Sequence, residues 1–361
     1  MTSVKVELGH RLFYDTRLSG TGTYACATCH RQELAFTDGL PRAVGATAEP
    51  HPRSAPSLAN VAYNASLTWA DPEVTTLEEQ ALSPMLNEHP VELGLAGREQ
   101  EVLSRLRDDP RYVGMFGSAF PDDPDAFTLG NVAKAIAAFE RTLISGDSPY
   151  NRLVWGGEMD ALSDSARRGM RLFFSDRLRC SECHAGFTLS GPAAFEGDRD
   201  VRPAFHNTGL YEVDGRGAYP DDNRGLGEHT GLPEDMGKFR APTLYNVAVT
   251  APYMHDGSVA TLDEVLEIYA AGGRRVTSGP NVGDGRANPN KSFRVAGFAL
   301  TREDKDDLLA FLESLTDERF LTDPRFGNPF ESAIAEAPTS ARDTGAPTTR
   351  AAPSASDRTT P

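Results

Sequence analysis

The chain of 361 residues lacks long hydrophobic runs, is poor in cysteine and has a deficit of basic charge. No apolar stretch approaches the roughly 18–20 residues of a membrane-spanning helix, so we expect no membrane span. The formal net charge of −16 argues against nucleic acid or an anionic membrane as a partner, because an acidic surface is repelled by both. The N-terminus, Met1–His10, also lacks the hydrophobic segment of a signal peptide.

The four cysteines all lie in two C-x-x-C-H motifs, Cys26–His30 and Cys180–His184. This motif attaches c-type haem: two thiols bond to the porphyrin and the adjacent histidine becomes the proximal iron ligand. One motif alone could be half of a zinc site. Two motifs that use every cysteine instead predict two covalent haem c groups. The predicted haem-binding residues are Cys26, Cys29 and His30 for the first haem, and Cys180, Cys183 and His184 for the second.

Haem c is attached outside the cytoplasm. We therefore expect a periplasmic or otherwise extracytoplasmic protein, whose leader peptide is not present in this chain.

The sequence around the two motifs is repeated. Arg11–His30 and Arg171–His184 both contain an R-L-F-aromatic segment and an Arg-Leu pair before the haem motif. Two copies indicate duplication rather than a solenoid, and the length also favours two domains. The expected division is an N-terminal haem domain at 1–145, a linker at 146–162, a C-terminal haem domain at 163–331 and a disordered tail at 332–361.

The hydrophobic periodicity predicts mainly helical structure with little β-structure. The expected helices are Glu7–Phe13, Leu77–Met85, Arg98–Arg107, Asp125–Ile144, Ser163–Phe174, Thr261–Ala271 and Thr301–Leu315. Gly39–Pro56 and Ser190–Asp235 have no such periodicity and are predicted as long loops, of a kind that often surrounds a cofactor. The fold class is therefore mainly α, with two tandem cytochrome c-like haem domains and long loops.

The residue at the sixth position of each iron decides the function of each haem. A methionine favours electron transfer, and an open position beside an acid–base group favours peroxide activation. A phenolate favours the higher oxidation states of iron.

Several segments make the relationship to known proteins specific. Arg240–Gly273 closely resembles the second-haem region of the bacterial diheme cytochrome c peroxidase and MauG family, and C-A-T-C-H, S-L-A-N-V-A-Y-N and H-P-V-E-L-G match in the first half. The similarity extends from about Val6 to Leu321. The segments EHPVELGLAGRE, AFERTLISGDSPY and FHNTGLY most resemble the MbnH-like diheme enzymes of this family.

This resemblance implies an activity. MbnH-like enzymes use hydrogen peroxide to form a high-valent bis-Fe(IV) state. They then oxidise an aromatic residue of a partner protein by long-range electron transfer, converting tryptophan to kynurenine.

For the second haem, the resemblance implies a tyrosine ligand. Ordinary diheme peroxidases have a methionine ligand fourteen residues after the histidine of P-Y-x-H-D-G, whereas MauG-type enzymes have tyrosine there. In this chain the histidine is His255 and the corresponding residue is Tyr269, the expected ligand opposite His184. His255 itself is expected to form hydrogen bonds near the haem edge. Alternatively, Tyr269 is an ordinary helix residue and Met254 or Met236 reaches the iron.

For the first haem, the resemblance implies a peroxide-binding pocket. The family places a glutamate there in a P-V-E-x-G segment, and Glu92 occupies that position. A carboxylate can take a proton from peroxide and return it to the leaving oxygen; the alternative is a solvated loop acid. Gln80 and Pro84 have the family's mutual spacing but lie two residues further from Glu92 than in MauG. In many peroxidases a loop histidine caps the iron in the resting state, and His51 and His89 are the candidates for that role here. Neither lies in a clean motif match, so the favoured interpretation is that both are surface histidines.

Three further features concern coupling and electron exit. Trp69 resembles the tryptophan that lies between the haems in this family and relays electrons between them; the alternative is a packed core tryptophan. The Asn60 side chain and the Thr250 and Pro252 carbonyls match an interdomain calcium site, and oxygen ligands suit calcium. MauG has a surface tryptophan at the position of Leu178, so that exit route for electrons is absent or lies elsewhere.

Two competing functions remain. One is a peroxidase that reduces hydrogen peroxide with electrons from a small redox-protein donor, and Tyr269 in place of methionine argues against it. The other is a non-enzymatic diheme electron carrier, and the motif around Glu92 argues against that. Hydrogen peroxide and a substrate or electron-donor protein are the expected partners.

Overall fold

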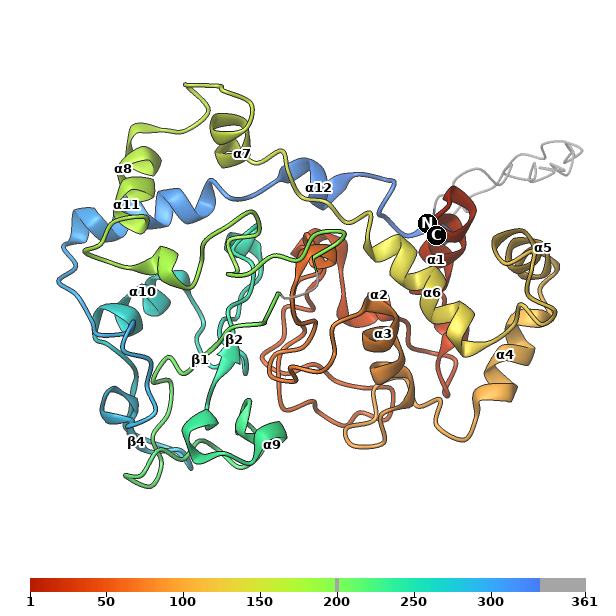
Figure 1. Ribbon diagram of the computed structural model, residues 1–361, viewed down its shortest axis with the longest axis horizontal. Helices are drawn as coiled ribbons and strands as arrows, with labels where there is room; N and C mark the ends of the chain where they lie inside the picture. Colours follow the sequence, from red (N-terminus) through yellow and green to blue (C-terminus); the bar gives the residue numbers. More distant parts are fainter. Residues whose placement is uncertain (199–200, 332–361) are drawn as a thin grey trace, which may run out of the picture.

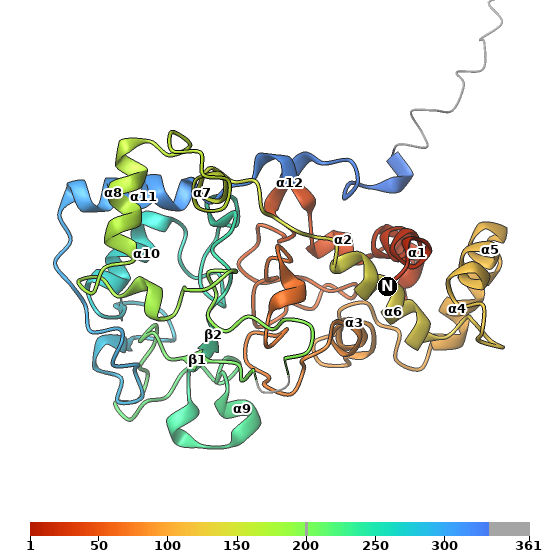
Figure 2. The same ribbon diagram turned by 45° about the horizontal axis from the view of Figure 1, so that its top comes forward.

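The computed structural model describes residues 1–198 and 201–331, so the predicted disordered tail at 332–361 lies outside the described residues. Figure 1 shows two lobes side by side, one formed by the N-terminal part of the chain and one by the C-terminal part. Figure 2 shows the same separation after rotation, with α12 extending from the second lobe toward the first. None of the helices in the described ranges is long and apolar enough to cross a membrane.

In the N-terminal lobe, helices pack around α6. The helices are α1 (Ser3–Tyr14), α2 (Cys26–Cys29), α3 (Leu77–Leu86), α4 (Glu99–Arg107), α5 (Pro110–Ala119) and α6 (Leu129–Glu140). A side chain at Gly9 of α1 would lie 1.8 Å from the Ala135 carbonyl oxygen, so glycine is required where α1 and α6 cross. The predicted helix Asp125–Ile144 is shorter in the structure because Thr128 caps its N-terminus.

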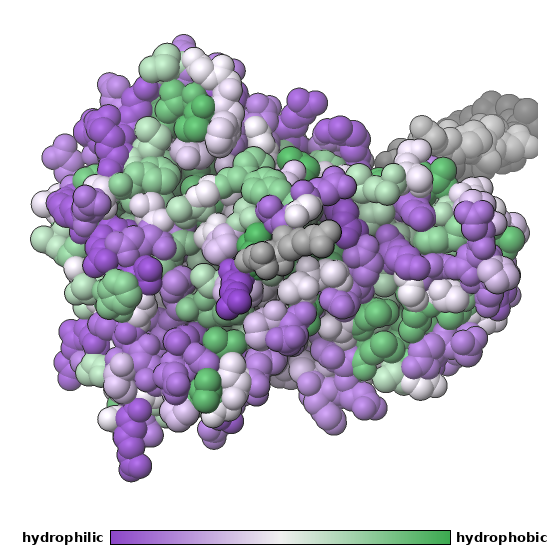
Figure 3. All heavy atoms as spheres, viewed as in Figure 1, coloured by the Kyte–Doolittle hydropathy of each residue, from purple (hydrophilic) through white to green (hydrophobic). Residues whose placement is uncertain are grey.

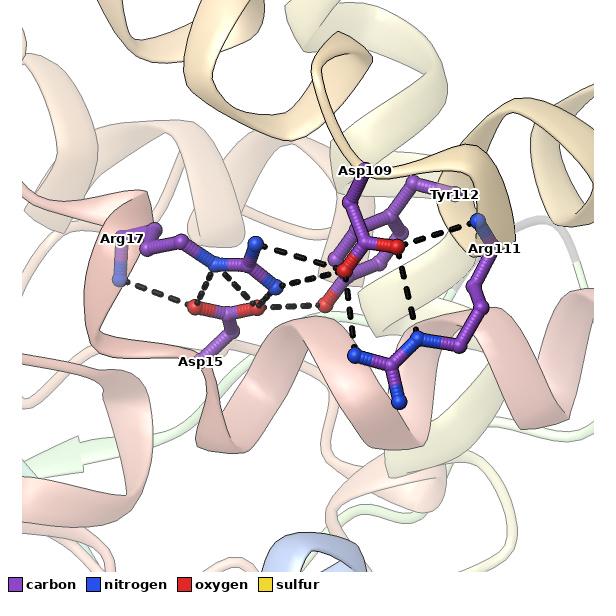
Figure 4. Close-up of polar contacts among 5 residues, drawn as sticks. All are labelled: Asp15, Arg17, Asp109, Arg111 and Tyr112. Carbon is purple, nitrogen blue, oxygen red and sulfur yellow. Dashed lines mark hydrogen bonds and ion pairs between the residues drawn. The ribbon is translucent and has the colours of Figure 1, made fainter.

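A polar cluster fastens α5 to the end of α1 (Figure 4). The buried carboxylate of Asp15 pairs with Arg17 at 2.7 Å and accepts a hydrogen bond from the Tyr112 hydroxyl at 2.7 Å. Asp109 pairs with both Arg17 and Arg111, at 3.3 and 3.2 Å. These bonds satisfy the charges that burial would otherwise leave unpaired.

In the C-terminal lobe, α8 and α11 form the main helix pair. The helices from here to the end are α7 (Pro149–Val154), α8 (Asp164–Phe173), α9 (Gly227–Thr230), α10 (Leu262–Ala270), α11 (Arg302–Glu313) and α12 (Glu318–Thr322). A Cβ at Gly169 would lie 1.9 Å from the Asp307 carbonyl oxygen. Arg168 binds the Asp307 carboxylate with two hydrogen bonds of 2.7 Å. The close approach and this ion pair fix the two helices together.

The described residues contain little β-structure, as predicted. Strands β1 (Phe205–His206) and β2 (Phe239–Arg240) pair antiparallel, as do β3 (Arg275–Val276) and β4 (Gly283–Asp284). The predicted loop 190–235 contains β1 and α9, so it is not wholly irregular. Short 3-10 helices occur at Thr16–Leu18, Gln32–Leu34, Val61–Tyr63, Cys180–Glu182, Pro233–Asp235, Val247–Val249 and Gly285–Ala287.

The two lobes are joined at Ser145. Asn60 and Asn246 each begin a 3-10 helix from a left-handed backbone conformation, with φ of 57° and 62°. The Asn60 amide donates to the Ser145 carbonyl at 2.9 Å, and the Asn246 amide donates to the Ser145 hydroxyl at 3.0 Å. The shared N-V-A turn adds a structural repeat to the duplicated haem motifs.

The connection between the lobes differs from the expected linker and end point. The segment 146–162 contains α7, which Ser148 caps and Pro149 begins. After α11, the chain returns to the first lobe: the Gln32 amide donates to the Phe320 carbonyl at 3.0 Å, and the Tyr14 hydroxyl donates to the Phe326 carbonyl at 2.7 Å. The end of the expected C-terminal domain therefore packs on the N-terminal lobe. The division into two domains otherwise remains a prediction.

Candidate functional site

The N-terminal lobe contains a cavity of about 640 Å³, a volume that includes space open to solvent, and Cys26, Cys29 and His30 line it. The His30 Nδ1 lies 2.7 Å from the Phe36 carbonyl oxygen. A backbone carbonyl on Nδ1 is the usual support of a metal-binding histidine, because it leaves Nε2 available. Burial lowers the pKa of His30, which favours the neutral imidazole that binds metal.

The predicted peroxide-binding residues line this same cavity. Gln80 and Pro84 lie one turn apart on α3 and so share a face of the helix. Glu92 reaches the cavity from the following segment, which is tied to α3 by a 2.8 Å hydrogen bond from the Leu93 N–H to the Pro84 carbonyl. The structure thus brings the three residues together despite the altered spacing.

The environment of Glu92 suits an acid–base group. Burial raises the pKa of Glu92, and its carboxylate accepts one long hydrogen bond of 3.4 Å from the Asn87 amide. A carboxyl whose pKa is raised by burial holds its proton more strongly than a solvated one, which suits a group that takes up a proton and returns it. Its catalytic role, and those of Gln80 and Pro84, remain predictions.

His51 and His89 were both expected at the surface, and the structure places them in different environments. His89 is exposed, but His51 is only partly exposed and lines the cavity of the first haem motif. The surface interpretation is therefore wrong for His51. Its Nδ1 accepts the Arg53 N–H at 3.1 Å, and burial lowers the pKa of His51 to about 4.

Sequence reasoning missed Glu140, the last residue of α6. Glu140 is 5% exposed, lines the first cavity and has one carboxylate oxygen without a hydrogen-bond partner among the described residues. Burial raises the pKa of Glu140 to about 8. The available signal was an acidic residue in the apolar run A-I-A-A-F-E, whose spacing places Glu140 on the same side as Ile136.

The C-terminal lobe contains a larger cavity of about 1490 Å³, which includes space open to solvent at its mouth. Cys180, Cys183 and His184 line it. The His184 Nδ1 lies 3.0 Å from the Leu189 carbonyl oxygen, and burial lowers the pKa of His184 to about 4. The second motif therefore repeats the arrangement of the first, with a neutral and oriented imidazole.

Tyr269 lines the same cavity as His184. It lies on the face of α10 that also presents Leu262 and Leu266, because residues three, four and seven apart share one side of a helix. Burial raises the pKa of Tyr269, so its phenolate form requires a nearby cation. Ferric iron in this cavity would provide one.

The alternative methionine ligands differ in position. Met254 lines the second cavity together with Tyr269. Met236 is not among the lining residues and instead packs against the apolar cluster that includes Tyr219 and Phe239. The geometry therefore favours Met254 over Met236 as the competitor of Tyr269.

Two buried polar groups on the second cavity lack partners that a haem would supply. His255 stacks on Phe239 with ring centroids 3.7 Å apart, and its Nε2 has no hydrogen-bond partner in the described ranges. Burial lowers the pKa of His255 to about 4. Arg240 is also buried and forms no ion pair with any described carboxylate; it donates to the Thr68 carbonyl at 3.1 Å. Haem propionates would satisfy both groups, so the residues present fit the cofactor.

Trp69 lies between the lobes. Its ring lines the second cavity, and its indole N–H donates to the Ser54 carbonyl of the first lobe at 2.9 Å. The Arg240 N–H in turn donates to the Trp69 carbonyl at 2.9 Å. Trp69 therefore contacts residues of both lobes, and its position between the haems and its role in coupling remain predictions.

At the predicted calcium site, the side chains of Asn60 and Thr250 form hydrogen bonds within the protein. Both atoms of the Asn60 amide bind the Ser145 backbone, at 2.9 and 3.1 Å, and the Thr250 hydroxyl donates to the Val247 carbonyl at 3.2 Å. The described residues contain no cluster of three or more His, Cys, Asp or Glu side chains that could hold a metal ion. The predicted site with Asn60, Thr250 and Pro252 uses other ligand types and remains a prediction; no step below depends on it.

The chain is similar to known proteins along most of its length. The family model of di-haem cytochrome c peroxidase, CCP_MauG, matches residues 3–159. The chain is 33% identical over 318 residues to the methylamine utilization protein MauG of Methylorubrum extorquens, covering 88% of this chain and 80% of that protein. The chain belongs to the di-haem cytochrome c peroxidase and MauG family.

Other relatives of this family are similar along most of their length. The cytochrome-c peroxidase IdrP1 of Denitromonas iodatirespirans is 35% identical over 350 residues, covering 92% of this chain and 87% of that protein. The crystal structure of a MauG-like protein associated with microbial copper homeostasis is 46% identical, with a TM-score of 0.89, and covers 91% of this chain and 94% of that chain. The predicted family and the mainly helical fold class are confirmed, as is a peroxide-dependent diheme oxidoreductase activity.

Proposed function

We propose that this diheme enzyme uses hydrogen peroxide to oxidise an aromatic side chain, most simply a tryptophan converted to kynurenine, of a partner protein. The observation that carries the proposal is the position of Tyr269, whose phenol lines the same cavity as His184 and its two cysteines. Phenolate ligation favours the higher oxidation states of haem iron, whereas a thioether favours the reduced state. A second haem that holds oxidising equivalents at a high-valent iron is suited to the oxidation of another protein.

Each of the two cavities would hold one haem. Cys26, Cys29 and His30 would hold one haem, and Cys180, Cys183, His184 and Tyr269 the other. The bound haems supply the reduction of peroxide and the storage of its two oxidising equivalents. Glu92 takes the first proton of peroxide and returns it to the leaving oxygen, so that water departs.

The remaining residues position peroxide, hold the second haem and connect the two cavities for electron transfer. Gln80 and Pro84 form the α3 wall of the peroxide cavity, which limits how a small molecule lies beside Glu92. Trp69 is anchored to both lobes, so its indole is held in a fixed place for electron transfer between them. His255 and Arg240 would hold the propionates of the second haem. Oxidising equivalents then leave for the partner without direct contact between partner and peroxide.

The chemical context of the partner follows from the relatives. The MauG-like protein that is 46% identical is associated with microbial copper homeostasis. We infer that the partner of this chain is an extracytoplasmic protein with an oxidisable aromatic residue, in a similar metal-handling setting.

The test is mass spectrometry of the partner after reaction. The holoprotein and a candidate partner are mixed with stoichiometric hydrogen peroxide, and tryptophan-containing peptides are searched for oxygen incorporation. Conversion of one tryptophan that requires both enzyme and peroxide supports the proposal. Peroxide reduction that leaves every partner aromatic residue unmodified contradicts it.

A second function is favoured by one observation, the presence of Met254 in the second cavity. A methionine-ligated second haem would accept electrons from a small redox protein and feed them to peroxide. Steady-state peroxide reduction with a reduced cytochrome or copper protein as donor, together with unmodified partner tryptophans, would support this alternative.

A further inference from the structure

The chain contains two tryptophans, and they lie in opposite environments. Trp69 lines the second haem cavity, whereas Trp155 is 68% exposed at the C-terminal end of α7. Trp155 is accompanied by two other exposed apolar residues, Val154 and Met159. Figure 3 shows apolar residues among hydrophilic ones at the top of the molecule, above α7 and α8. An exposed indole in such surroundings can contact another protein.

A short chain of contacts connects Trp155 with the second cavity. Asn151 lies between Trp155 and Tyr245, because its carbonyl accepts the Trp155 backbone N–H and its side-chain amide donates to the Tyr245 hydroxyl. Tyr245 is 2% exposed. The next residue in the chain, Leu244, lines the second cavity. An oxidisable surface ring is thus linked through one buried oxidisable ring to the cavity wall.

The local structure fixes the Tyr245 ring and the backbone at Trp155. The Asn151 side-chain amide donates to the Tyr245 hydroxyl at 2.8 Å, and the Trp155 backbone N–H donates to the Asn151 backbone carbonyl at 2.8 Å. Ser148 and Asn151 form a reciprocal capping box at the start of α7. Asn151 therefore fixes the end of α7 and the buried tyrosine relative to one another.

Leu178 and Phe293 do not offer the same route. Leu178 is buried and aliphatic, so it cannot exchange electrons at the surface. Phe293 is exposed beside Arg179 and Arg294, two residues of the cavity wall. A phenyl ring is much harder to oxidise than an indole, so Phe293 does not serve as a relay.

We propose that Trp155 is the surface residue through which oxidising equivalents leave the second haem site, and that a protein substrate presents its aromatic side chain over the end of α7. This inference rests on the proposed function. Trp155 loses one electron toward the cavity and regains one from the substrate side chain, twice per peroxide. Each peroxide takes up two electrons and two protons and yields two waters, and Trp155 is unchanged at the end.

The test traps the radical on the enzyme itself. The holoprotein reacts with hydrogen peroxide in the presence of the spin trap 2-methyl-2-nitrosopropane and without partner, and the adducts are located by peptide mass spectrometry. We expect the adduct on the peptide that contains Trp155. Trp155→Phe should lose this adduct, and Tyr245→Phe should reduce it. Phe293→Ala removes an exposed aromatic ring that packs against the cavity residues Arg179 and Arg294, and it should leave the Trp155 adduct unchanged.

The outcomes separate this inference from the proposed function. Normal peroxide consumption with adducts that avoid Trp155, or that stay at wild-type yield in Tyr245→Phe, would overturn the exit route alone. Absence of any peroxide reaction would overturn the proposed function together with this inference.

Discussion

Replacing Glu140 by glutamine changes the pH dependence of stability in a direction that the structure specifies. Burial raises the pKa of Glu140 to about 8 from its ordinary value of 4.5. In the unfolded chain the carboxyl ionises above pH 4.5, whereas in the folded protein it keeps its proton until about pH 8. Between these two pKa values the free energy of unfolding decreases as the pH rises, because the unfolded chain releases the Glu140 proton and the folded protein keeps it. The lost stability returns as the pH falls toward 4.5.

The size of the effect follows from the same linkage. One pH unit between the two pKa values corresponds to about 1.4 kcal/mol. From pH 5 to pH 7 the wild-type protein should therefore lose about 3 kcal/mol of unfolding free energy through this residue. Glutamine does not titrate. Its amide leaves a buried polar group without a partner, a cost of about 1–3 kcal/mol that is the same at both pH values and cancels from the comparison.

The assay is urea unfolding of the holoprotein at several pH values between 5 and 8, followed by haem absorbance. The difference in unfolding free energy between Glu140→Gln and wild type should shift in favour of the variant by about 3 kcal/mol from pH 5 to pH 7. Glu79→Gln, on exposed α3 surface, is the matched control and should show no such shift. If the difference in unfolding free energy between Glu140→Gln and wild type is constant with pH, the inference that Glu140 is buried and protonated is refuted.

Three other substitutions test the site and the fold. Tyr269→Met should abolish the near-infrared absorption that peroxide produces in MauG-like enzymes while mass spectrometry still finds both haems attached; a band of wild-type intensity would exclude Tyr269 as the ligand. Glu92→Gln should slow the stopped-flow reaction with peroxide by about 10²–10⁴-fold, the usual contribution of a general acid–base residue, and unchanged rates would remove Glu92 from that role. Gly169→Ala should destabilise the C-terminal lobe by about 1–3 kcal/mol or more, because the new methyl group would lie 1.9 Å from the Asp307 carbonyl oxygen. Gly114→Ala in α5, where the methyl group meets open space, should instead stabilise slightly in thermal unfolding, and equal effects of the two would contradict the packing of α8 on α11.

The features predicted well from the sequence are those whose physical cause is local. A haem motif carries its two thiols and its imidazole within five residues, and the two cavities indeed contain both motifs. The caps Ser163, Thr261 and Thr301 begin α8, α10 and α11, because a side-chain oxygen satisfies free N–H groups of the first turn.

The features missed depend on tertiary contacts. Glu140 was assigned to no site because its burial arises only when α6 packs against α1 and α3. The helix α7 lies in a stretch rich in glycine and polar residues, so the signal of Ser148 and Pro149 was not recognised. Tyr269 and His184 are far apart in sequence, and only the family resemblance linked them before the cavity placed them together.

The ligand of the second iron is the most direct test of this account. Resonance Raman spectra of the ferric holoprotein, prepared with unlabelled and ring-deuterated tyrosine, would detect phenolate vibrations enhanced by bonding to iron. We predict tyrosine-sensitive bands that disappear in Tyr269→Phe while both haems remain attached. Spectra without any tyrosine-sensitive band, together with the absorption of methionine-ligated haem and its loss in Met254→Leu, would contradict the account and leave a peroxidase that draws electrons from a donor protein.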